Sequence, residues 1–438
     1  MPQFINAQID GPYVGTSEAD SLSGLFEITD ATFNIAEAGI INANIATLAG
    51  DDRVEGISVV ALAPNAQATA AAFGVANTSI DFGSGNDALA ADSTSLAGFS
   101  GVATSYGIVG SQVFGRGGKD TLFAIARSQS RIDATAIAVS SSLLSGGNHD
   151  DNIVISSRIT TQTEELASGL SVGVETATIR GDQGNDTIRV SAQGVNLLHG
   201  SEPARVSDTE TVVGLKSLAG IFGNSGNDFI QIKATGNAEL QATVVGSQNS
   251  KILGGTGHDT IEVTAQATGD GTASAIGLKD SLVKGGAGSD TITVTTQVSA
   301  TGTSDGYGAQ SSKVYGGSGD DLIRIRIDNG GTLDITDSLV HGGRGNDTID
   351  VGIGDVTIKG GTGNDTVVLD YLQQPGNHNF AIAALGNGLN ITGSLTQSNS
   401  FSESWQQRIT GVENFTVAGT TYSAEALIST FGSPTEIV

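Results

Sequence analysis

Residues 254–263 read GGTGHDTIEV, residues 285–294 read GGAGSDTITV and residues 316–325 read GGSGDDLIRI. Each stretch places two glycines, a third glycine and an aspartate ahead of alternating aliphatic residues. Glycine permits positive φ or a close approach of the backbone. Alternating aliphatic residues predict a strand with one buried face. Each stretch therefore predicts a tight turn followed by a strand.

The turn recurs along most of the chain. Indexed by its aspartate, it occurs at Asp20, Asp52, Asp87, Asp120, Asp151, Asp186, Asp228, Asp259, Asp290, Asp321, Asp347 and Asp365, in steps of 32, 35, 33, 31, 35, 42, 31, 31, 31, 26 and 18 residues. An aliphatic residue follows every aspartate by two places, and an aliphatic residue or tyrosine precedes it by seven. A unit of about 31 residues is too short to bury a core of its own, so it predicts one coil of a solenoid.

We therefore expect an all-β fold, a right-handed parallel β-helix or β-roll of about twelve coils with stacked turns and a β-rich C-terminal cap. Glycine and β-branched residues dominate every unit, which disfavours helix. The expected organisation is an N-terminal cap segment at 1–14, the solenoid at 15–369 and a C-terminal cap at 370–438. Asn, Asp or Ser usually precedes the aspartate, and we expect left-handed or turn geometry there.

The amino-acid composition restricts the classes of molecule that the chain can bind. Acidic residues outnumber basic ones by 46 to 20, and the net charge of −26 argues against nucleic acid and anionic membranes and points to cations. The chain has no cysteine, which excludes disulfides and thiolate metal sites. No run of ~20 apolar residues is present, so no membrane span is expected.

Stacking would place the aspartates in register ~5 Å apart, where neighbouring carboxylates repel by ~1 kcal/mol even in water. Carboxylates and backbone carbonyls from two adjacent turns would form the all-oxygen cage that Ca²⁺ prefers. Without thiolates or a regular histidine column, zinc and copper are disfavoured. Twelve turns have eleven interfaces, so we expect multiple Ca²⁺ ions, up to about eleven.

The motif G-G-x-G-x-D-x-U-x resembles the nonapeptide of RTX, or haemolysin-type, calcium-binding repeat proteins over residues 15–369. The resemblance implies that the aspartates donate carboxylates and the glycines donate carbonyls to ions between turns. It is strongest at Asp259, Asp290, Asp321, Asp347 and Asp365, weaker at Asp87, Asp120, Asp151, Asp186 and Asp228, and degenerate at Asp20 and Asp52. The glycines concerned are Gly254, Gly255, Gly257, Gly285, Gly286, Gly288, Gly316, Gly317, Gly319, Gly342, Gly343, Gly345, Gly360, Gly361 and Gly363.

The chain departs from the family in its spacing. RTX β-rolls repeat the nonapeptide back to back on an 18-residue coil, and only the step from Asp347 to Asp365 has that length. The longer steps predict a larger parallel β-helix with one calcium column that tapers towards the C-terminus. A serine also stands nine places before six of the aspartates. It predicts either an inward hydroxyl ladder or small residues tolerated at a corner, and the sequence leaves both open.

The pattern stops after Asp365, and residues 408–429, RITGVENFTVAGTTYSAEALIS, resemble the tail that follows many RTX repeats. The tail predicts a β cap, a type I secretion signal, or both. We expect a secreted or cell-surface structural protein, non-enzymatic, in a surface layer, sheath, fibril or adhesive coat, with repeats similar to those of cyanobacterial surface proteins of the oscillin kind. Calcium would drive its folding, and its further partners would be copies of itself or cell-surface polysaccharide.

Two other functions were weighed. A polysaccharide-acting β-helix enzyme, a lyase or epimerase, would need a cluster of titratable residues on one groove, and the scattered Lys and Arg do not assemble one. An ice-binding solenoid would need a regular outward threonine row, and the corresponding columns are irregular.

Overall fold

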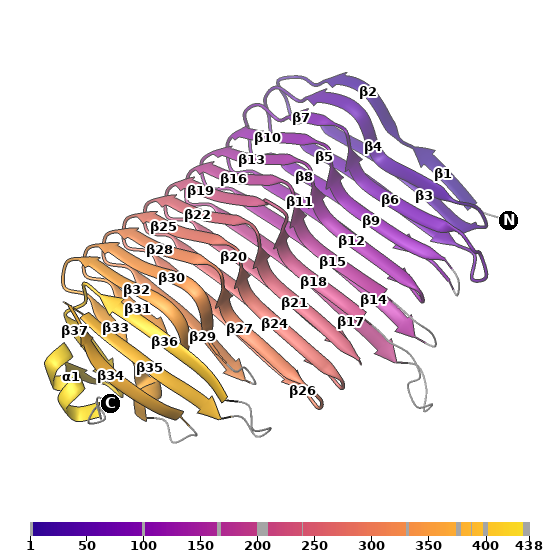
Figure 1. Ribbon diagram of the computed structural model, residues 1–438. Coiled ribbons are helices and arrows are strands. Elements are labelled where there is room, and N and C mark those ends of the chain that lie inside the picture. The colour runs from indigo at the N-terminus through magenta and orange to yellow at the C-terminus, as the bar shows by residue number, and fades with distance from the viewer. Residues whose placement is uncertain are drawn as a thin grey trace.

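The computed structural model describes residues 3–98, 101–163, 168–198, 209–238, 240–329, 333–373, 378–386, 388–396 and 402–431. Within these ranges the chain is nearly all β-strand. Its strands stack as parallel coils into one solenoid, with the N-terminal strands at one end and the C-terminal cap at the other (Figure 1). The all-β solenoid expected from the repeat is confirmed.

The first face of the solenoid is built from the strands that follow the aspartates. These strands are β3(Ser21–Ala31), β5(Arg53–Leu62), β8(Ala88–Leu96), β11(Thr121–Ser130), β14(Asn152–Thr163), β17(Thr187–Leu198), β20(Phe229–Ala238), β23(Thr260–Gly269), β26(Thr291–Ala300), β29(Leu322–Asn329), β31(Thr348–Val351) and β33(Thr366–Val368). Each pairs in parallel with the next, and β1(Gln3–Ala7) closes the N-terminal edge antiparallel to β3.

The second face carries the middle strand of each coil. Its strands are β6(Thr69–Ala76), β9(Val102–Val109), β12(Asp133–Ser140), β15(Ser168–Glu175), β18(Thr209–Lys216), β21(Gln241–Gln248), β24(Thr272–Lys279) and β27(Ser304–Gln310).

The third face leads into the glycine-rich turns. Its strands are β2(Ile9–Val14), β4(Ile35–Ala46), β7(Ser79–Asp81), β10(Gln112–Gly117), β13(Leu143–Asn148), β16(Thr178–Gln183), β19(Gly220–Ser225), β22(Lys251–Thr256), β25(Leu282–Ala287), β28(Lys313–Ser318), β30(Ile335–Arg344) and β32(Gly354–Thr362). Strand β4 is long enough to pair with both β6 and β7, so it serves the second and third faces together.

The solenoid has about nine full turns, fewer than the roughly twelve coils expected from the motif count. The nine coils that begin at Asp20 to Asp290 are full length, with 31 to 42 residues each. The coil after Asp321 loses its separate middle strand, because β30 pairs with both β27 and β28. The last repeats therefore form smaller turns, which is the taper that the shortening steps predicted.

The register explains the regular sequence columns. Ile261 pairs with Ile292 and Ile292 with Ile323, so the residue two places after each aspartate stacks on its equivalent in the next coil. The column seven places before the aspartate stacks in the same way, for example Ile252 on Val283. These side chains are fully buried. Stacked aliphatic ladders thus form the core. Their burial stabilises the fold by about 25 cal/mol for each Å² of apolar surface removed from water.

The serine column also points inward. Ser281 is 4% exposed, its hydroxyl donates to the carbonyl of Lys279 at 2.8 Å, and the backbone N–H of Ser281 donates to Oγ of Ser312 at 3.1 Å. Ser111 and Ser142 are linked in the same way at 3.0 Å. The hydroxyl-ladder interpretation is therefore correct for these copies, and it supplies hydrogen bonds to backbone groups at a buried corner.

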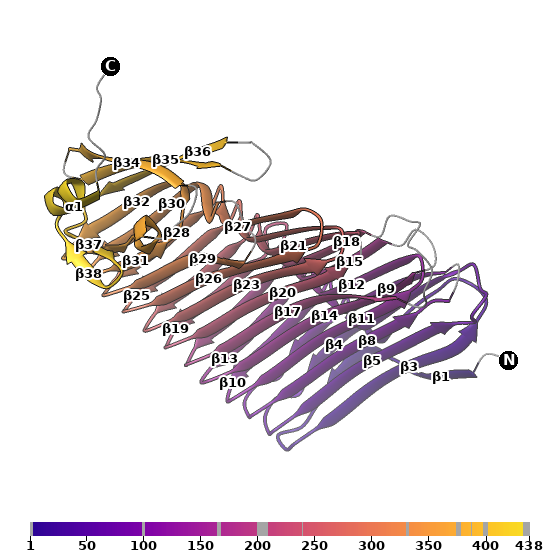
Figure 2. The same cartoon turned by 90° about the horizontal axis from the view of Figure 1, so that it is seen from below.

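The C-terminal end is covered by a small antiparallel unit and a helix (Figure 2). Its elements are η1(Asp370–Gln373), β34(His378–Leu385), β35(Gly388–Thr396), β36(Ser402–Thr410), β37(Asn414–Val417), β38(Thr420–Tyr422) and α1(Ala424–Phe431). Strand β36 pairs in parallel with β32, and β37 with β33, so the cap extends the coil stacking. Among the described helices, none is long and apolar enough to cross a membrane.

Candidate metal centre

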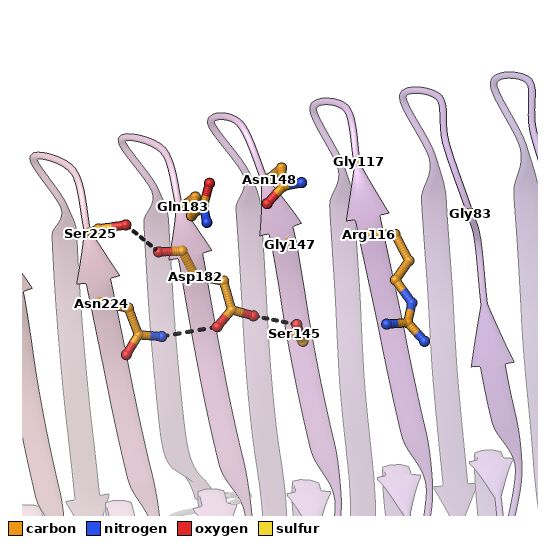
Figure 3. Close-up of a pocket in the computed structure, with 10 residues that line it drawn as sticks. All are labelled: Gly83, Arg116, Gly117, Ser145, Gly147, Asn148, Asp182, Gln183, Asn224 and Ser225. Atoms are coloured by element: carbon orange, nitrogen blue, oxygen red, sulfur yellow. Dashed lines mark hydrogen bonds between the residues drawn. The ribbon is translucent and has the colours of Figure 1, made fainter.

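The aspartates lie where each third-face strand turns into the next first-face strand, and Figure 3 shows several of these turns stacked side by side. The backbone N–H of each aspartate donates to Oδ1 of the aspartate in the following coil, from Asp20 to Asp365, at 2.7–2.9 Å. All twelve predicted aspartates therefore belong to one continuous ladder along the solenoid.

The second carboxylate oxygen of each ladder aspartate, Oδ2, does not take part in these hydrogen bonds. Oδ2 is buried and has no hydrogen-bond partner in Asp52, Asp87, Asp120, Asp151, Asp186, Asp228, Asp259, Asp290, Asp321, Asp347 and Asp365. These eleven residues are only 1–3% exposed. Leaving a buried acceptor unpaired costs roughly 1–3 kcal/mol, more where it is charged. The column therefore needs a bound cation or proton at each Oδ2.

The first glycine of the motif opens the space beside Oδ2. A Cβ added to Gly316 would meet Oδ2 of Asp321, and it would lie 2.7 Å from the carbonyl oxygen of Gly342 in the next coil. The equivalent Cβ at Gly254 would meet Oδ2 of Asp259 and the carbonyl oxygen of Gly285. A carboxylate oxygen and a carbonyl oxygen thus border one small space. Both are acceptors, so neither can satisfy the other unless a cation or a proton lies there.

The second and third glycines fulfil a backbone requirement. Gly286 and Gly288 have φ of 130° and 121°, a region that side chains disfavour. A Cβ on either would collide with the carbonyl oxygen of the matching glycine in the preceding coil. The other predicted glycines at these two places of the motif would likewise meet a carbonyl oxygen of the preceding coil, that of Asn224 for Gly255 and that of a glycine for Gly257, Gly317, Gly319, Gly343, Gly345, Gly361 and Gly363. Glycine lets the turns stack this closely without backbone strain.

Burial and neighbouring charges make it costly to ionise the ladder aspartates when no cation is bound. Burial raises the pKa of Asp87, Asp228, Asp290 and Asp321 to about 7, and that of Asp151 to about 8. The neighbouring ladder aspartates raise these pKa values further, while the hydrogen bond from the preceding N–H lowers them. In the absence of a cation these carboxyl groups therefore keep their protons to a higher pH than a free aspartate does, and ionising them in the folded chain costs free energy.

The donor set fits calcium. Across the described ranges, no group of three or more His, Cys, Asp or Glu side chains lies close enough to hold a metal. A site at the ladder must therefore combine few carboxylates with main-chain carbonyls of the glycine turns. Such an all-oxygen set suits a hard cation, and a loop lined by glycines suits Ca²⁺ better than Mg²⁺. Eleven Ca²⁺ ions would carry a charge of +22, against the net charge of −26.

The first turn differs from the others. Oδ2 of Asp20 accepts a hydrogen bond from the N–H of Thr16 at 2.7 Å, so this carboxylate is not left without a partner. By contrast Asp52, whose turn lacks two glycines of the motif, and Asp151, whose turn has His149 at the third glycine, keep an unpaired Oδ2. Degenerate motif letters therefore do not remove a turn from the ladder.

Two features of the site were missed from the sequence. The N–H of Asp365 donates to Oε2 of Glu413 at 2.9 Å, so the cap supplies a further acidic residue at the end of the ladder. Phe415 follows Glu413 by two places and is fully buried on Val367, as the pattern requires. The signal was present in the spacing of Glu413 and Phe415, but this turn is three residues shorter than the others.

The second missed feature is a ladder on the exposed side of the turns. The N–H of the residue before the aspartate donates to the side chain of its equivalent in the preceding coil, as from Asn227 to Asn185 at 2.7 Å and from Asn346 to Asp320 at 2.7 Å. Of the two geometries expected at this place, left-handed or turn, the structure shows the turn, because none of these residues has positive φ. Their polar side chains are explained by the hydrogen bonds that they accept.

Among the coils that replace the second glycine by a larger residue, three carry Arg116, Asp182 and Asn224, with φ of 77–79°. They line a polar groove of about 670 Å³ (Figure 3). Asp182 accepts hydrogen bonds from the hydroxyl of Ser145 and, at 3.1 Å, from Nδ2 of Asn224. Arg116 pairs with Asp81 at 2.7 Å. A residue such as arginine in the left-handed backbone conformation costs of order 1 kcal/mol. The groove therefore keeps side chains at positions where glycine would be less strained.

Comparison with known protein families agrees with this geometry. The family model of the RTX calcium-binding nonapeptide repeat matches residues 177–192 and 341–370, in four copies. These ranges contain Asp186, Asp347 and Asp365 of the ladder. No curated protein matches the chain as a whole or in part.

Proposed function

Since the chain carries RTX-type calcium-binding repeats, we propose that it is a secreted structural protein of the cell surface whose folding is driven by Ca²⁺ held between stacked turns. The carrying observation is the row of eleven buried Oδ2 atoms that have no hydrogen-bond partner. A protein that keeps so many acceptors unpaired gains stability from cations in proportion to their number.

Folding that depends on calcium binding is suited to a protein that is exported from the cell. At low cytosolic calcium the carboxylate ladder opposes compaction, because its members repel one another and are costly to bury. In millimolar extracellular calcium the same ladder becomes a source of stability, since a preformed site does not exist in the unfolded chain. A C-terminal secretion signal of type I in the region 370–438 is part of this proposal.

The proposed structural role is supported by how the described residues are used. Their strands form the solenoid and its cap, and the ladder runs from the first coil to the cap. Such a rod can act as a building element of a surface layer, sheath or fibril. Assembly between copies is included in the proposal, because the ends of a solenoid present edge strands.

Circular dichroism during a calcium titration tests the proposal. We expect the β-sheet signal to rise cooperatively with calcium and to fall in EGTA, with magnesium far less effective. Electron microscopy of the calcium-loaded protein would then show sheets or filaments. A β-sheet signal that is identical with calcium and in EGTA would contradict calcium-driven folding, and dispersed single rods at high concentration would contradict the assembly role.

The groove beside Asp182 favours a second candidate, a polysaccharide-acting enzyme of the lyase or epimerase class. It combines a carboxylate, a guanidinium and amide side chains on the outer face of a parallel β-helix. Incubation with uronic acid polymers tests it: new unsaturated ends or epimerised residues, lost in Asp182→Asn, would support an enzyme. Unchanged polymer would leave the structural role in place.

A further inference from the structure

The outer surface of the third face changes character towards the C-terminal end. From β22 to β36, each of six successively paired strands carries a basic residue at one of two neighbouring outward positions of the register, and β30 also carries the exposed Arg344 nearer the turn. These residues, named here the basic stripe, are Lys251, Lys284, Lys313, His341, Lys359 and Arg408. The five Lys and Arg members are exposed, and His341 is partly exposed. Figure 1 shows the strands β22, β25, β28, β30 and β32 side by side on one face.

The basic stripe stands out from the rest of the molecule. The chain has 20 Lys and Arg and a net charge of −26, yet five of the 20 lie in this stripe, which is two register positions wide. Among the described residues, no ion pair joins a stripe cation to a carboxylate, whereas Arg116, Lys119 and Arg127 elsewhere are each paired. Asp337 and Asp355 border the stripe near Lys313 and Arg408, and Asp280 occupies the same corner one coil earlier. The row therefore keeps a local positive excess.

The spacing of the stripe is set by the fold. Parallel strands lie ~4.8 Å apart, so the six basic residues span roughly 24 Å along the solenoid axis, with a lysine or arginine on every strand except β30, where His341 stands. Like charges held at this spacing repel one another, and no packing contact of the described side chains requires them. A linear anion with one negative charge per similar distance would match the row along its whole length.

Rings lie among the cations. Tyr315 and His341 contact each other edge to face with centroids 6.0 Å apart, and Nζ of Lys284 lies 5.3 Å from the centre of the Tyr315 ring. In this column the two rings are neighbours, with Lys284 before them and Lys359 after them, and rings flanked by cations suit sugars whose apolar faces stack on aromatic side chains while their acidic groups meet the lysines.

From this arrangement we infer that the basic stripe binds a linear acidic polysaccharide of the polyuronate class, laid along the solenoid with successive carboxylates over successive coils. A second copy of this chain fits less well. The exposed row of residues that precede the ladder aspartates is acidic only at Asp51, Asp150 and Asp320, so this edge cannot place an acid opposite each of six coils.

The inference requires the calcium-loaded fold but not the surface-layer role. The test uses the full-length calcium-loaded protein and oligogalacturonates of defined length, too short to gel with calcium, followed by calorimetry. We expect affinity to increase with oligomer length until about six sugars are present, and to weaken as NaCl screens the charges. Neutral oligoglucosides of the same length should not bind.

The stripe variant Lys284→Gln, Lys313→Gln, Lys359→Gln should bind about tenfold more weakly or worse, because three of five full charges are lost. The matched control Arg127→Gln, Arg189→Gln, Lys233→Gln makes the same change in net charge on the exposed side of the first face. It should bind like the wild type. Circular dichroism in calcium checks that each variant is folded. If the folded, calcium-loaded wild-type protein does not bind oligogalacturonate, this inference is wrong and the proposed function still stands.

Three results would overturn the inference. Equal binding by the stripe variant and the control would show that calcium bridges the polymer to acidic groups elsewhere. Binding of neutral oligomers would remove the role of charge. Self-association of the wild type that the stripe variant abolishes, together with no oligogalacturonate binding, would assign the row to an interface between copies.

Discussion

Replacing Asp321 by asparagine should change stability in opposite directions with and without calcium. Oδ1 of Asp321 accepts from the N–H of Asp290 at 2.8 Å, and an asparagine oxygen can keep this bond. Oδ2 has no partner and borders the space next to the carbonyl oxygen of Gly342. In the variant a side-chain amide NH₂ group replaces Oδ2, and this group can donate to that carbonyl but cannot bind a cation.

The two magnitudes follow from the charge. Burial raises the pKa of Asp321 from 3.8 to about 7. A full shift of that size is worth ~4 kcal/mol at pH 8, and screening at the edge of the solenoid reduces it to about 1–2 kcal/mol. Asp321→Asn should therefore stabilise the chelated protein by about 1–2 kcal/mol. In calcium it weakens the ion positions on both sides, and a tenfold loss at each lowers stability by about 3 kcal/mol.

Urea unfolding at pH 8, followed by far-UV circular dichroism in EGTA and in saturating calcium, measures both effects. If the chelated wild type is already unfolded, the variant should retain more β-sheet signal. The adjacent Asp320→Asn makes the same charge change at an exposed site whose Oδ1 accepts from the N–H of Asn346 at 2.7 Å, and it should alter both states little. Equal shifts for the two variants, or the same sign in both conditions, would refute the reasoning.

Three further outcomes are expected. Gly285→Ala places a methyl group against Oδ2 of Asp290, so it should weaken calcium binding at least tenfold by calorimetry, whereas Thr256→Ala on the outer side of the turn should not. Glu413→Ala leaves the buried N–H of Asp365 unpaired at a cost of about 1–2 kcal/mol, and hydrogen exchange should accelerate in the last coils before it does so near Asp87; uniform acceleration would contradict this. In EGTA the folded pKa values of about 6–8 lie above the unfolded value near 3.9, so stability is full below about pH 4 and is lost as the pH rises towards 8. In calcium the trend reverses, since protons compete for the same oxygens; thermal unfolding from pH 4 to 8 measures both trends, and parallel curves would contradict the account.

The repeated columns could be predicted because one residue type serves one geometric task in every coil. Ile261 and Ile292 stack two places after their aspartates, and Ser281 and Ser312 turn inward at the same corner. The stacking of the aspartates followed from the same spacing. Register is strongly specified where one face is buried, so a constant spacing fixes the pairing.

Features that depend on a single coil could not be predicted in this way. Glu413 joins the ladder from a shortened turn, so its longer side chain replaces an aspartate at a different spacing. Glu210 lies in the interior, 3% exposed, in space left by Gly169 and Gly194, and its Oε2 accepts from the N–H of Asn237 at 2.9 Å. Burial raises its pKa to about 8, so it is largely protonated at neutral pH. A glycine in one coil that makes room for this large side chain in another is not part of the repeated motif, so the repeat spacing cannot predict it.

The coil number was overestimated for a related reason. The motif marks each turn, but it does not report how many strands lie between two turns. After Asp321 the steps of 26 and 18 residues are too short for three strands and their corners, and the fold responds by merging or dropping the middle strand. The taper was visible in the steps, whereas its effect on the cross-section required the strand pairing.

The central claim is that a continuous column of buried carboxylates binds one calcium ion at each interface between turns. Mass spectrometry of the native protein, desalted from calcium under non-denaturing conditions, tests it most directly by counting the metal retained. We expect about ten or eleven calcium ions per chain, lost together as the β-sheet signal collapses in chelator. A folded chain that retains no calcium, or one that retains only one or two ions, would contradict it.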